Sequence, residues 1–283
     1  MSARRRCILW ALLCVLTAIS LSAADRPITL VLIPDGLSPE ERAPLQAYLS
    51  KRMGHQVYLV IPNSYDEVLS GIRDGAYDFA NLGAVSYVRA HATLGAVPLV
   101  QSASDLNFHT VFITGTNSSI HSLRDLRGRQ FAFGDINSAS GHVIPYLDLK
   151  KAGIKPETDL QIRYTGGHPN TAKLVEAGVV DAGALDQEIF ESMLDGGKLD
   201  RAKVRVFYTS KPYINYVYVA RKGVSEANRG KFSKALLVLK EGKDDKILRI
   251  LRAKRFVLAH DQEYTSIRQI VKELKLLNVS NPD

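Results

Sequence analysis

The sequence predicts an α/β protein built from two units, and three observations support this fold class. Short β-rich runs alternate with helical patterns along most of the chain. The first five of these elements follow the order strand, helix, strand, helix, strand, which implies a parallel sheet covered by helices. The chain has 283 residues, enough for two cores, and it contains no repeat and no flexible linker.

The first unit starts with a clear helix signal. Ser38 is placed to cap a helix whose first residue is Pro39, a position that suits proline because the first N–H of a helix has no partner. We expect the elements of this unit at 28–34 (strand), from 38 (helix), 57–62 (strand), 64–75 (helix) and 77–83 (strand). Ligands of such sheets bind beyond the carboxyl ends of the strands. Those ends carry Pro34-Asp35, Asn63-Ser64-Tyr65 and Gly83 to Tyr87.

The second unit continues the alternation. Its expected elements are strands at 109–115, 130–134, 160–167, 180–186 and 204–210, and helices that end at Gly153 and Gly178. A long apolar strand at 214–223 then leads the chain back to the first unit, and residues 224–283 are mostly amphipathic helix.

Residues 1–24 have the features of a secretory signal peptide. Three arginines precede an apolar run from Cys7 to Leu21, and small residues follow it, so we expect cleavage after Ala24. An uncleaved membrane anchor is the alternative, but the apolar run is shorter than the roughly 20 residues that a spanning helix needs. We therefore expect the mature protein in the periplasm.

Removal of this leader limits the chemistry of the mature protein. Both cysteines, Cys7 and Cys14, lie in the leader, so disulfides, cysteine-ligated metals and cysteine nucleophiles are excluded. The seven histidines show no metal-ligand spacing, and we expect no cofactor. The remaining 34 basic and 29 acidic residues give a net charge of +5, spread along the chain, which does not indicate a nucleic-acid partner.

The stretch "GDINSASGH" at 134–142 lies between an expected strand and an expected helix. There Ser138, Ser140 and the first N–H groups of the helix face the same space and can hold an oxyanion. Ordinary capping of the helix by serine is the alternative. Because Pro145 has no N–H to bond to Gly141, we expect the helix to start one or two residues after Ser140. The spacing fixes no base beside Ser138, so we expect no enzymatic activity.

Five segments occur in an order and spacing that match a known family. They are "VLIPDGLSPEERAPLQAYLSKRMG", "PNSYDEVLSGIRDGAYDFANLGAVSYV", "SLRDLRGRQFAF", "NSASGHVIPYLDLKKAGIKPETD" and "TGGHPNTAKLVEAGVVDAGALD". Together they resemble the periplasmic phosphonate-, phosphite- and phosphate-binding proteins of ABC transporters. The resemblance implies a type II periplasmic binding protein fold, with two α/β lobes joined by two crossing strands. It assigns residues 25–107 and 219–283 to one lobe and 108–218 to the other.

The resemblance also implies a ligand site between the lobes. The residues that match the family's ligand contacts are Tyr65, Tyr87, Ser138, Ala139, Ser140, His168 and Asp186. Ala139 stands where the family tends to have threonine, so one hydroxyl donor is missing. Without a ligand, these residues would be core tyrosines, a capping serine, a solvated or capping histidine and a surface acid.

Two features bear on the identity of the ligand. A carboxylate at Asp186, with Glu188 close by in the sequence, can accept a P–OH proton, whereas sulfate near neutral pH has none to give. Asp186 would then discriminate by protonation state, or pair with the ammonium of an aminophosphonate. Some relatives have an aspartate facing that ammonium where this chain has Tyr213, Asn215, Tyr216 and Tyr218. We therefore do not expect 2-aminoethylphosphonate as the preferred ligand.

The function implied by the resemblance is that of an extracytoplasmic solute-binding protein. It would capture a phosphorus oxyanion (phosphonate, phosphite or phosphate) by hinge closure and deliver it, as a monomer, to the membrane permease of an ABC transporter. A periplasmic ligand-sensing subunit that acts on a sensor kinase is the alternative, because both kinds of protein use ligand-stabilised closure.

Overall fold

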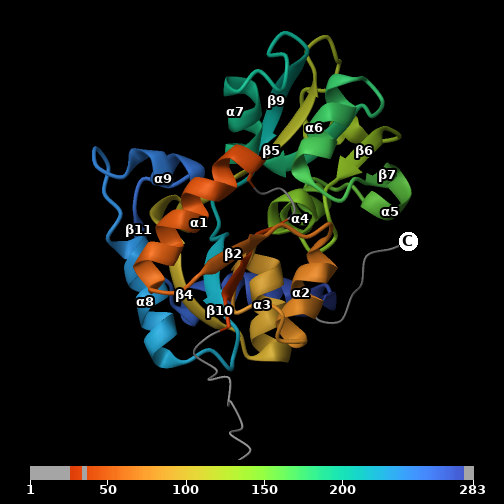
Figure 1. Cartoon of the computed structure of the whole chain (residues 1–283). Coiled ribbons are helices and arrows are strands. Elements are labelled where there is room, and N and C mark those ends of the chain that lie inside the picture. Colours follow the sequence, from red (N-terminus) through yellow and green to blue (C-terminus); the bar gives the residue numbers. More distant parts are fainter. Residues whose placement is uncertain (1–25, 34–36, 277–283) are drawn as a thin grey trace, which may run out of the picture.

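The computed structural model describes residues 26–33 and 37–276, so the expected signal peptide and Pro34-Asp35 lie outside the described residues. The described chain forms two α/β lobes, each around its own sheet (Figure 1). We call the lobe of the six-stranded sheet lobe 1 and the lobe of the five-stranded sheet lobe 2. None of the helices in the described part of the chain is long and apolar enough to cross a membrane.

The sheet of lobe 1 confirms the predicted parallel order. Its strands lie side by side as β11 (Phe256–Leu258), β4 (Val97–Ser102), β10 (Val217–Ala220), β3 (Phe79–Leu82), β1 (Ile28–Val31) and β2 (Val57–Val60). β1 pairs in parallel with β2 and with β3, whereas β10 is antiparallel to β3 and β4. Adjacent residues of β1 alternate between two apolar clusters, Leu30 in one and Val31 in the other, because helices cover both faces.

The helices of lobe 1 include the two predicted near its N-terminus and three in the region 224–283, which the sequence predicts to be mostly helical. They are α1 (Pro39–Met53), α2 (Tyr65–Arg73), α3 (Ala84–Leu94), α8 (Glu226–Leu237), α9 (Asp245–Ile250) and α10 (Thr265–Glu273), with the short turn η4 (Asp261–Tyr264) before α10. Ser38 precedes α1 and forms a capping box with Glu41, and Ser64 caps α2 by accepting from the Glu67 N–H.

Lobe 2 has a mixed sheet. Its strands lie in the order β7 (Gln161–Tyr164), β6 (Gln130–Phe133), β8 (Ala182–Asp186), β5 (Thr110–Gly115) and β9 (Val204–Thr209). Its helical segments are η2 (Leu123–Leu126), the π-helical turn η3 (Ala139–Val143), α4 (Ile144–Lys151), α5 (Pro156–Asp159), α6 (His168–Glu176) and α7 (Gln187–Asp195). β6 is parallel to both β7 and β8, so the carboxyl ends of these three strands meet at one edge.

Two neighbouring segments connect the lobes. The chain leaves lobe 1 through η1 (Ala103–Asn107) and returns between β9 and β10, and Phe108 and Tyr213 bond to each other through both backbone N–H groups. The return strand is shorter than the predicted 214–223. β10 pairs with lobe 1 from Val217 onward. We therefore place the segment that returns to lobe 1, which we call the return crossing, at residues 210–216 and not at 218/219.

Two strands of lobe 1 have no counterpart among the predicted elements. β4 was not predicted, and β11 lies in a region that we expected to be mostly helical. β11 has three residues and exists through its antiparallel pairing with β4, at the edge of the sheet. Such a short edge strand depends on a distant partner and leaves little local signal.

Candidate functional site

The structure brings four of the predicted site residues to one edge of the lobe 2 sheet. Ser138 and Ser140 follow β6, His168 follows β7, and Asp186 ends β8. Because these three strands are adjacent and parallel, the residues after them converge. All four are nearly inaccessible to solvent: Ser138 is 2% exposed, Ser140 and Asp186 are 1% exposed, and His168 is fully buried.

The stretch 134–142, which we call the serine loop, runs into a π-helical turn that leads into α4. Ser138 accepts the Gly141 N–H on its Oγ at 3.0 Å, and its carbonyl accepts the N–H groups of His142 and Val143. Pro145 leaves the Gly141 carbonyl without a helical donor, and the Gly134 N–H supplies one at 2.8 Å. The regular helix therefore begins at Ile144, later than predicted, and Ser140 lies inside the π turn, not in a loop before the helix.

The imidazole of His168 points its donor at the two serines. Its Nε2 lies 3.5 Å from Ser138 Oγ and 3.3 Å from Ser140 Oγ. Its Nδ1 accepts the backbone N–H of Asp186 at 3.3 Å, so the proton of the neutral ring is on Nε2. A Cβ on Gly141 would lie 3.1 Å from the His168 ring and 3.1 Å from Ser138 Oγ, so glycine permits this close packing.

The carboxylate of Asp186 joins lobe 2 to the return crossing. Its Oδ1 caps α7 by accepting the Ile189 N–H at 2.9 Å, and its Oδ2 accepts the Tyr216 hydroxyl at 2.8 Å. Nearby, the Tyr213 hydroxyl lies 2.8 Å from Thr110 Oγ1, which itself donates to the Ser140 carbonyl. Burial, followed by the charge of Asp186, raises the pKa of Tyr213, so this phenol stays protonated.

Two helices of lobe 1 contact the serine loop directly. Asn137 donates through Nδ2 to Asp66 Oδ1 at 3.1 Å, and its carbonyl accepts the Ser86 hydroxyl at 3.3 Å. Tyr65, the first residue of α2, is buried next to Asp66. The residue before the serine pair is therefore held by both α2 and α3.

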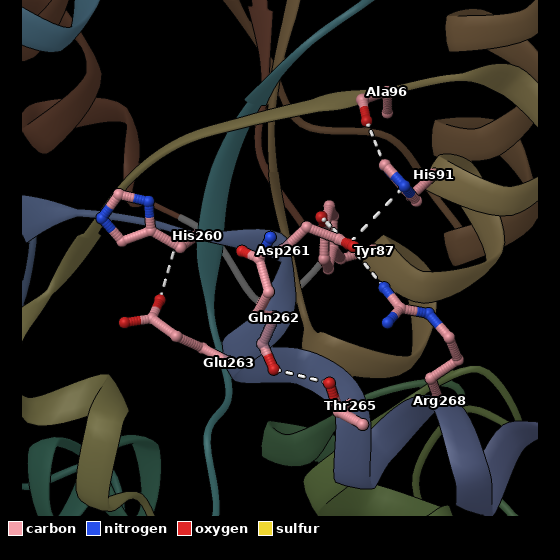
Figure 2. A network of polar contacts seen from close by, with 9 residues as sticks. All are labelled: Tyr87, His91, Ala96, His260, Asp261, Gln262, Glu263, Thr265 and Arg268. Atoms are coloured by element: carbon pink, nitrogen blue, oxygen red, sulfur yellow. Dashed lines mark hydrogen bonds and ion pairs between the residues drawn. The ribbon is translucent and has the colours of Figure 1, made fainter.

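Tyr87 lies elsewhere, contrary to the expectation that it lines the cleft. Its hydroxyl donates to Asp261 at 2.7 Å, where the carboxylate also meets Arg268 and His91 (Figure 2). Its ring packs edge-on against Tyr264. Position 87 lies one turn into α3, where the side chain points into the lobe 1 core, so we leave Tyr87 out of the site.

The side chain of Ala139 does not face the serines either, contrary to the expectation that it contacts the ligand. Its side chain is buried in the apolar cluster that contains Val85 of lobe 1 and Ile214 of the return crossing. A methyl group suits these surroundings, whereas a hydroxyl there would need a hydrogen-bond partner. Only the backbone of Ala139 therefore remains available to the site.

A cavity of about 80 Å³ lies beside Asp186 and Tyr216, and Ser138, Ser140 and His168 are not among its lining residues. Its walls come from both lobes: Leu32, Ile33, Leu37, Asn81, Ser102, Asp105, Asp186, Glu188, Tyr216, Tyr218, Ile250, Leu251, Arg252 and Phe256. Burial and then the charge of Asp186 raise the pKa of Glu188 to about 7. Burial also raises the pKa of Asp105. Among the described residues no group of three histidine, aspartate or glutamate side chains is arranged to hold a metal ion.

Comparison with known proteins identifies the family. Residues 35–264 match the family model for the phosphonate ABC transporter periplasmic substrate-binding protein. The chain belongs to this family. A probable ABC transporter phosphite-binding protein of Prochlorococcus marinus is 29% identical over 241 residues, which cover 80% of this chain and 81% of that protein. The family consists of binding proteins, not enzymes, and its members act in the periplasm.

Solved structures agree with this assignment and with the predicted type II fold. The methylphosphonate complex of the Prochlorococcus marinus protein has a TM-score of 0.81 at 26% identity and covers 89% of this chain and 99% of its own. A binding component of a phosphonate transporter from Pseudomonas aeruginosa has a TM-score of 0.80 at 21% identity, with 89% and 88% covered. The latter likeness concerns the fold alone.

The carboxyl group of Glu188 should make the binding protein less stable as the pH rises. The folded protein holds this proton at pH values where the unfolded chain has released it. The free energy of unfolding therefore falls between about pH 4.5 and about pH 7. Glu188→Gln should remove this part of the pH dependence. Solvent reaches the half-buried group, so we expect a melting temperature only roughly 2–4 °C above the parent at pH 8, with no difference at pH 4.5.

Circular dichroism melts across this pH range would measure the effect. Glu191→Gln is the matched control, because Glu191 is exposed on the same helix and accepts a hydrogen bond from Gln187. Equal curves for Glu188→Gln and the parent would show that Glu188 titrates normally.

Proposed function

We propose that this binding protein captures a phosphorus oxyanion between Ser138, Ser140 and His168 and delivers it to the membrane permease of an ABC transporter. The observation that carries the proposal is the convergence of two hydroxyls and the His168 Nε2–H at the start of a helix, buried from solvent. Donors and a helix N-terminus are what an oxyanion requires, and burial strengthens each bond.

The acidic partner of the proposed site is Asp186. One of its oxygens caps α7 and the other accepts from Tyr216, and each oxygen has a second lone pair. In our proposal one of these lone pairs accepts the P–OH proton of a singly protonated phosphonate, phosphite or phosphate. A fully ionised tetrahedral anion would meet an uncompensated carboxylate there.

The cavity beside Asp186 bears on the substituent of the ligand. Its volume of about 80 Å³ leaves room for a small group on phosphorus. Asp105, Asp186 and Glu188 all line it, so the cavity has acidic groups although tyrosines occupy the return crossing. The lack of the family's aspartate is therefore a weaker argument against 2-aminoethylphosphonate than the sequence indicated, and this anion belongs in any ligand series.

Export through a cleaved signal peptide at residues 1–24 and a monomeric state also belong to the proposal. The alternative, a sensing role, finds some support in a 24% identical match to the tetrathionate sensor histidine kinase of Salmonella typhimurium. The match covers 68% of this chain and 36% of that kinase. The family match over residues 35–264 favours transport.

Ligand-dependent thermal unfolding of residues 25–283 tests the proposed function. We expect stabilisation by at least one of phosphate, phosphite, methylphosphonate and 2-aminoethylphosphonate, and none by sulfate. A ligand at about 100 times its dissociation constant adds about 2.7 kcal/mol to the free energy of unfolding. For a chain of this size the melting temperature should rise by roughly 5–10 °C.

A dye-based melt is suitable because the only tryptophan, Trp10, lies in the expected leader. Equal stabilisation by sulfate would contradict the protonation argument. Absence of a shift with every phosphorus compound would overturn the proposed ligand class.

A further inference from the structure

The N-terminus of α3 lies at the same interface and lacks a capping side chain of its own. Its N-cap is Gly83, which has no side chain to accept from the first turn. Asn215, from the return crossing, supplies one acceptor instead: its Oδ1 takes the Ala84 N–H at 3.3 Å. α3 has 11 residues, so its first turn carries the positive end of a full helix dipole.

The other half of the same amide is an unused buried donor. Asn215 is 1% exposed, and its Nδ2 has no hydrogen-bond partner among the described residues. The orientation of the amide is fixed, because a flipped amide would set Nδ2 against the Ala84 N–H, donor against donor. A buried donor without a partner is unfavourable and rare, so it points to a group that the ligand-free protein lacks.

The position of Asn215 brings this donor to the lobe boundary. β10 pairs antiparallel with β3, Val217 opposite Leu82, so the residues before Val217 run past the carboxyl end of β3, where the Asn215 amide lies next to Gly83 and Ala84. On one side its neighbour Tyr216 bonds to Asp186. On the other side Tyr213 reaches the Ser140 carbonyl through Thr110.

The first turn of α3 also touches the serine loop. Ser86 donates its hydroxyl to the carbonyl of Asn137, the residue before Ser138. The N-terminus of α3 and the N-terminal turn that leads into α4 therefore approach each other across the boundary between the lobes. An oxyanion between them would be favoured by both helix ends at once.

We propose that Asn215 Nδ2, together with the N-terminus of α3, forms the lobe 1 half of the oxyanion site; this rests on the proposed function. Lobe 2 contributes Ser138, Ser140 and His168, and Asn215 contributes the donor that the anion reaches when the lobes close. The anion then joins the two lobes, so its binding would stabilise the closed form. Asn215 is thus a ligand contact as well as a cap of α3.

Asn215→Asp separates these two roles. The new carboxylate keeps an acceptor for the Ala84 N–H, and the positive end of α3 offsets part of the unfavourable burial of its charge, so the unliganded melting temperature should fall by at most a few degrees. The donor to the anion is lost and a negative charge is added, so affinity for methylphosphonate and phosphite should fall by about 100-fold or more in calorimetric titrations. The deficit should narrow at acidic pH, where the introduced carboxyl is protonated and donates again.

Asn228→Asp is the matched control, because it makes the same change in the first turns of α8, a helix that packs against α1. It should bind like the parent. Affinity of Asn215→Asp within about threefold of the parent would overturn the proposal, while leaving the proposed function intact. A parent that binds neither anion would overturn both.

A measurement on the parent covers the case in which Asn215→Asp folds poorly. In a sample labelled with ¹⁵N on asparagine, an Nδ2 proton of Asn215 should shift downfield when methylphosphonate is added. An unchanged resonance at saturation would overturn the ligand contact whatever the stability of the variant.

Discussion

Replacement of Ser138 and Ser140 together by alanine is expected to weaken binding of the phosphorus oxyanion by at least about 100-fold, because each hydroxyl bond to a charged oxygen contributes about 1.5–3 kcal/mol. His168 Nε2–H and the helix N–H groups remain, so binding should be weakened and not abolished. Calorimetric titration with the anion that stabilises the parent would measure the loss.

The same double variant should cost the unliganded protein little. Ser138 caps the π turn through the Gly141 N–H, and loss of a serine cap costs about 1 kcal/mol, or roughly 2–4 °C in melting temperature. Ser225→Ala is the matched control, because Ser225 caps α8 in the same way through the Asn228 N–H and its side chain is exposed on the surface of lobe 1. It should lose stability and keep full affinity. Binding by the double variant within about threefold of the parent would remove the serine loop from the site.

Local signals account for most of the fold that the sequence predicted. Ser38, Pro39 and Ser64 mark helix starts that the structure confirms, because caps act within one turn of the chain. The carboxyl ends of β6, β7 and β8 were predicted from equally local signals, because an apolar run gives way to small and polar residues there. β11 was missed because it has three residues and depends on β4, more than 150 residues earlier in the chain.

The candidate site was predictable only where a residue ends or follows a strand. Ser138, Ser140, His168 and Asp186 are such residues, and parallel pairing brings them together. Tyr87 was misplaced because helical position alone does not tell which face of α3 meets the other lobe. Asn215 and Tyr216 were noted only as a departure from the family. Their role depends on the return crossing passing between the two lobes, which no local pattern records.

Asp186→Asn is expected to narrow the preference for methylphosphonate over sulfate by about 100-fold. The carboxylate accepts the proton of a P–OH group and repels an anion that has no proton to give. Asparagine is nearly isosteric and keeps an oxygen for the Ile189 N–H, so the cap of α7 should survive. The amide NH₂ group donates and cannot accept the P–OH proton, so affinity for the singly protonated phosphonate falls. The same group can donate to sulfate, so affinity for sulfate rises. In the parent, affinity should fall as the pH rises and the ligand loses its last proton, and this slope should flatten in the variant.

Glu188→Gln distinguishes a direct contact by Asp186 from a general effect of charge. Both substitutions remove one acidic group from the wall of the same cavity, but the Asp186 backbone N–H bonds to the His168 ring, which also meets the serines. If net charge in the cavity decided the preference, the two variants would change the ratio of phosphonate to sulfate affinity alike at pH 8, where Glu188 is mostly ionised. If the Asp186 carboxylate accepts the P–OH proton, only Asp186→Asn changes this affinity ratio. An unchanged ratio and pH slope in Asp186→Asn would mean that Asp186 serves to cap α7, accept the Tyr216 hydroxyl and orient His168, and that discrimination between the anions arises elsewhere in the cleft.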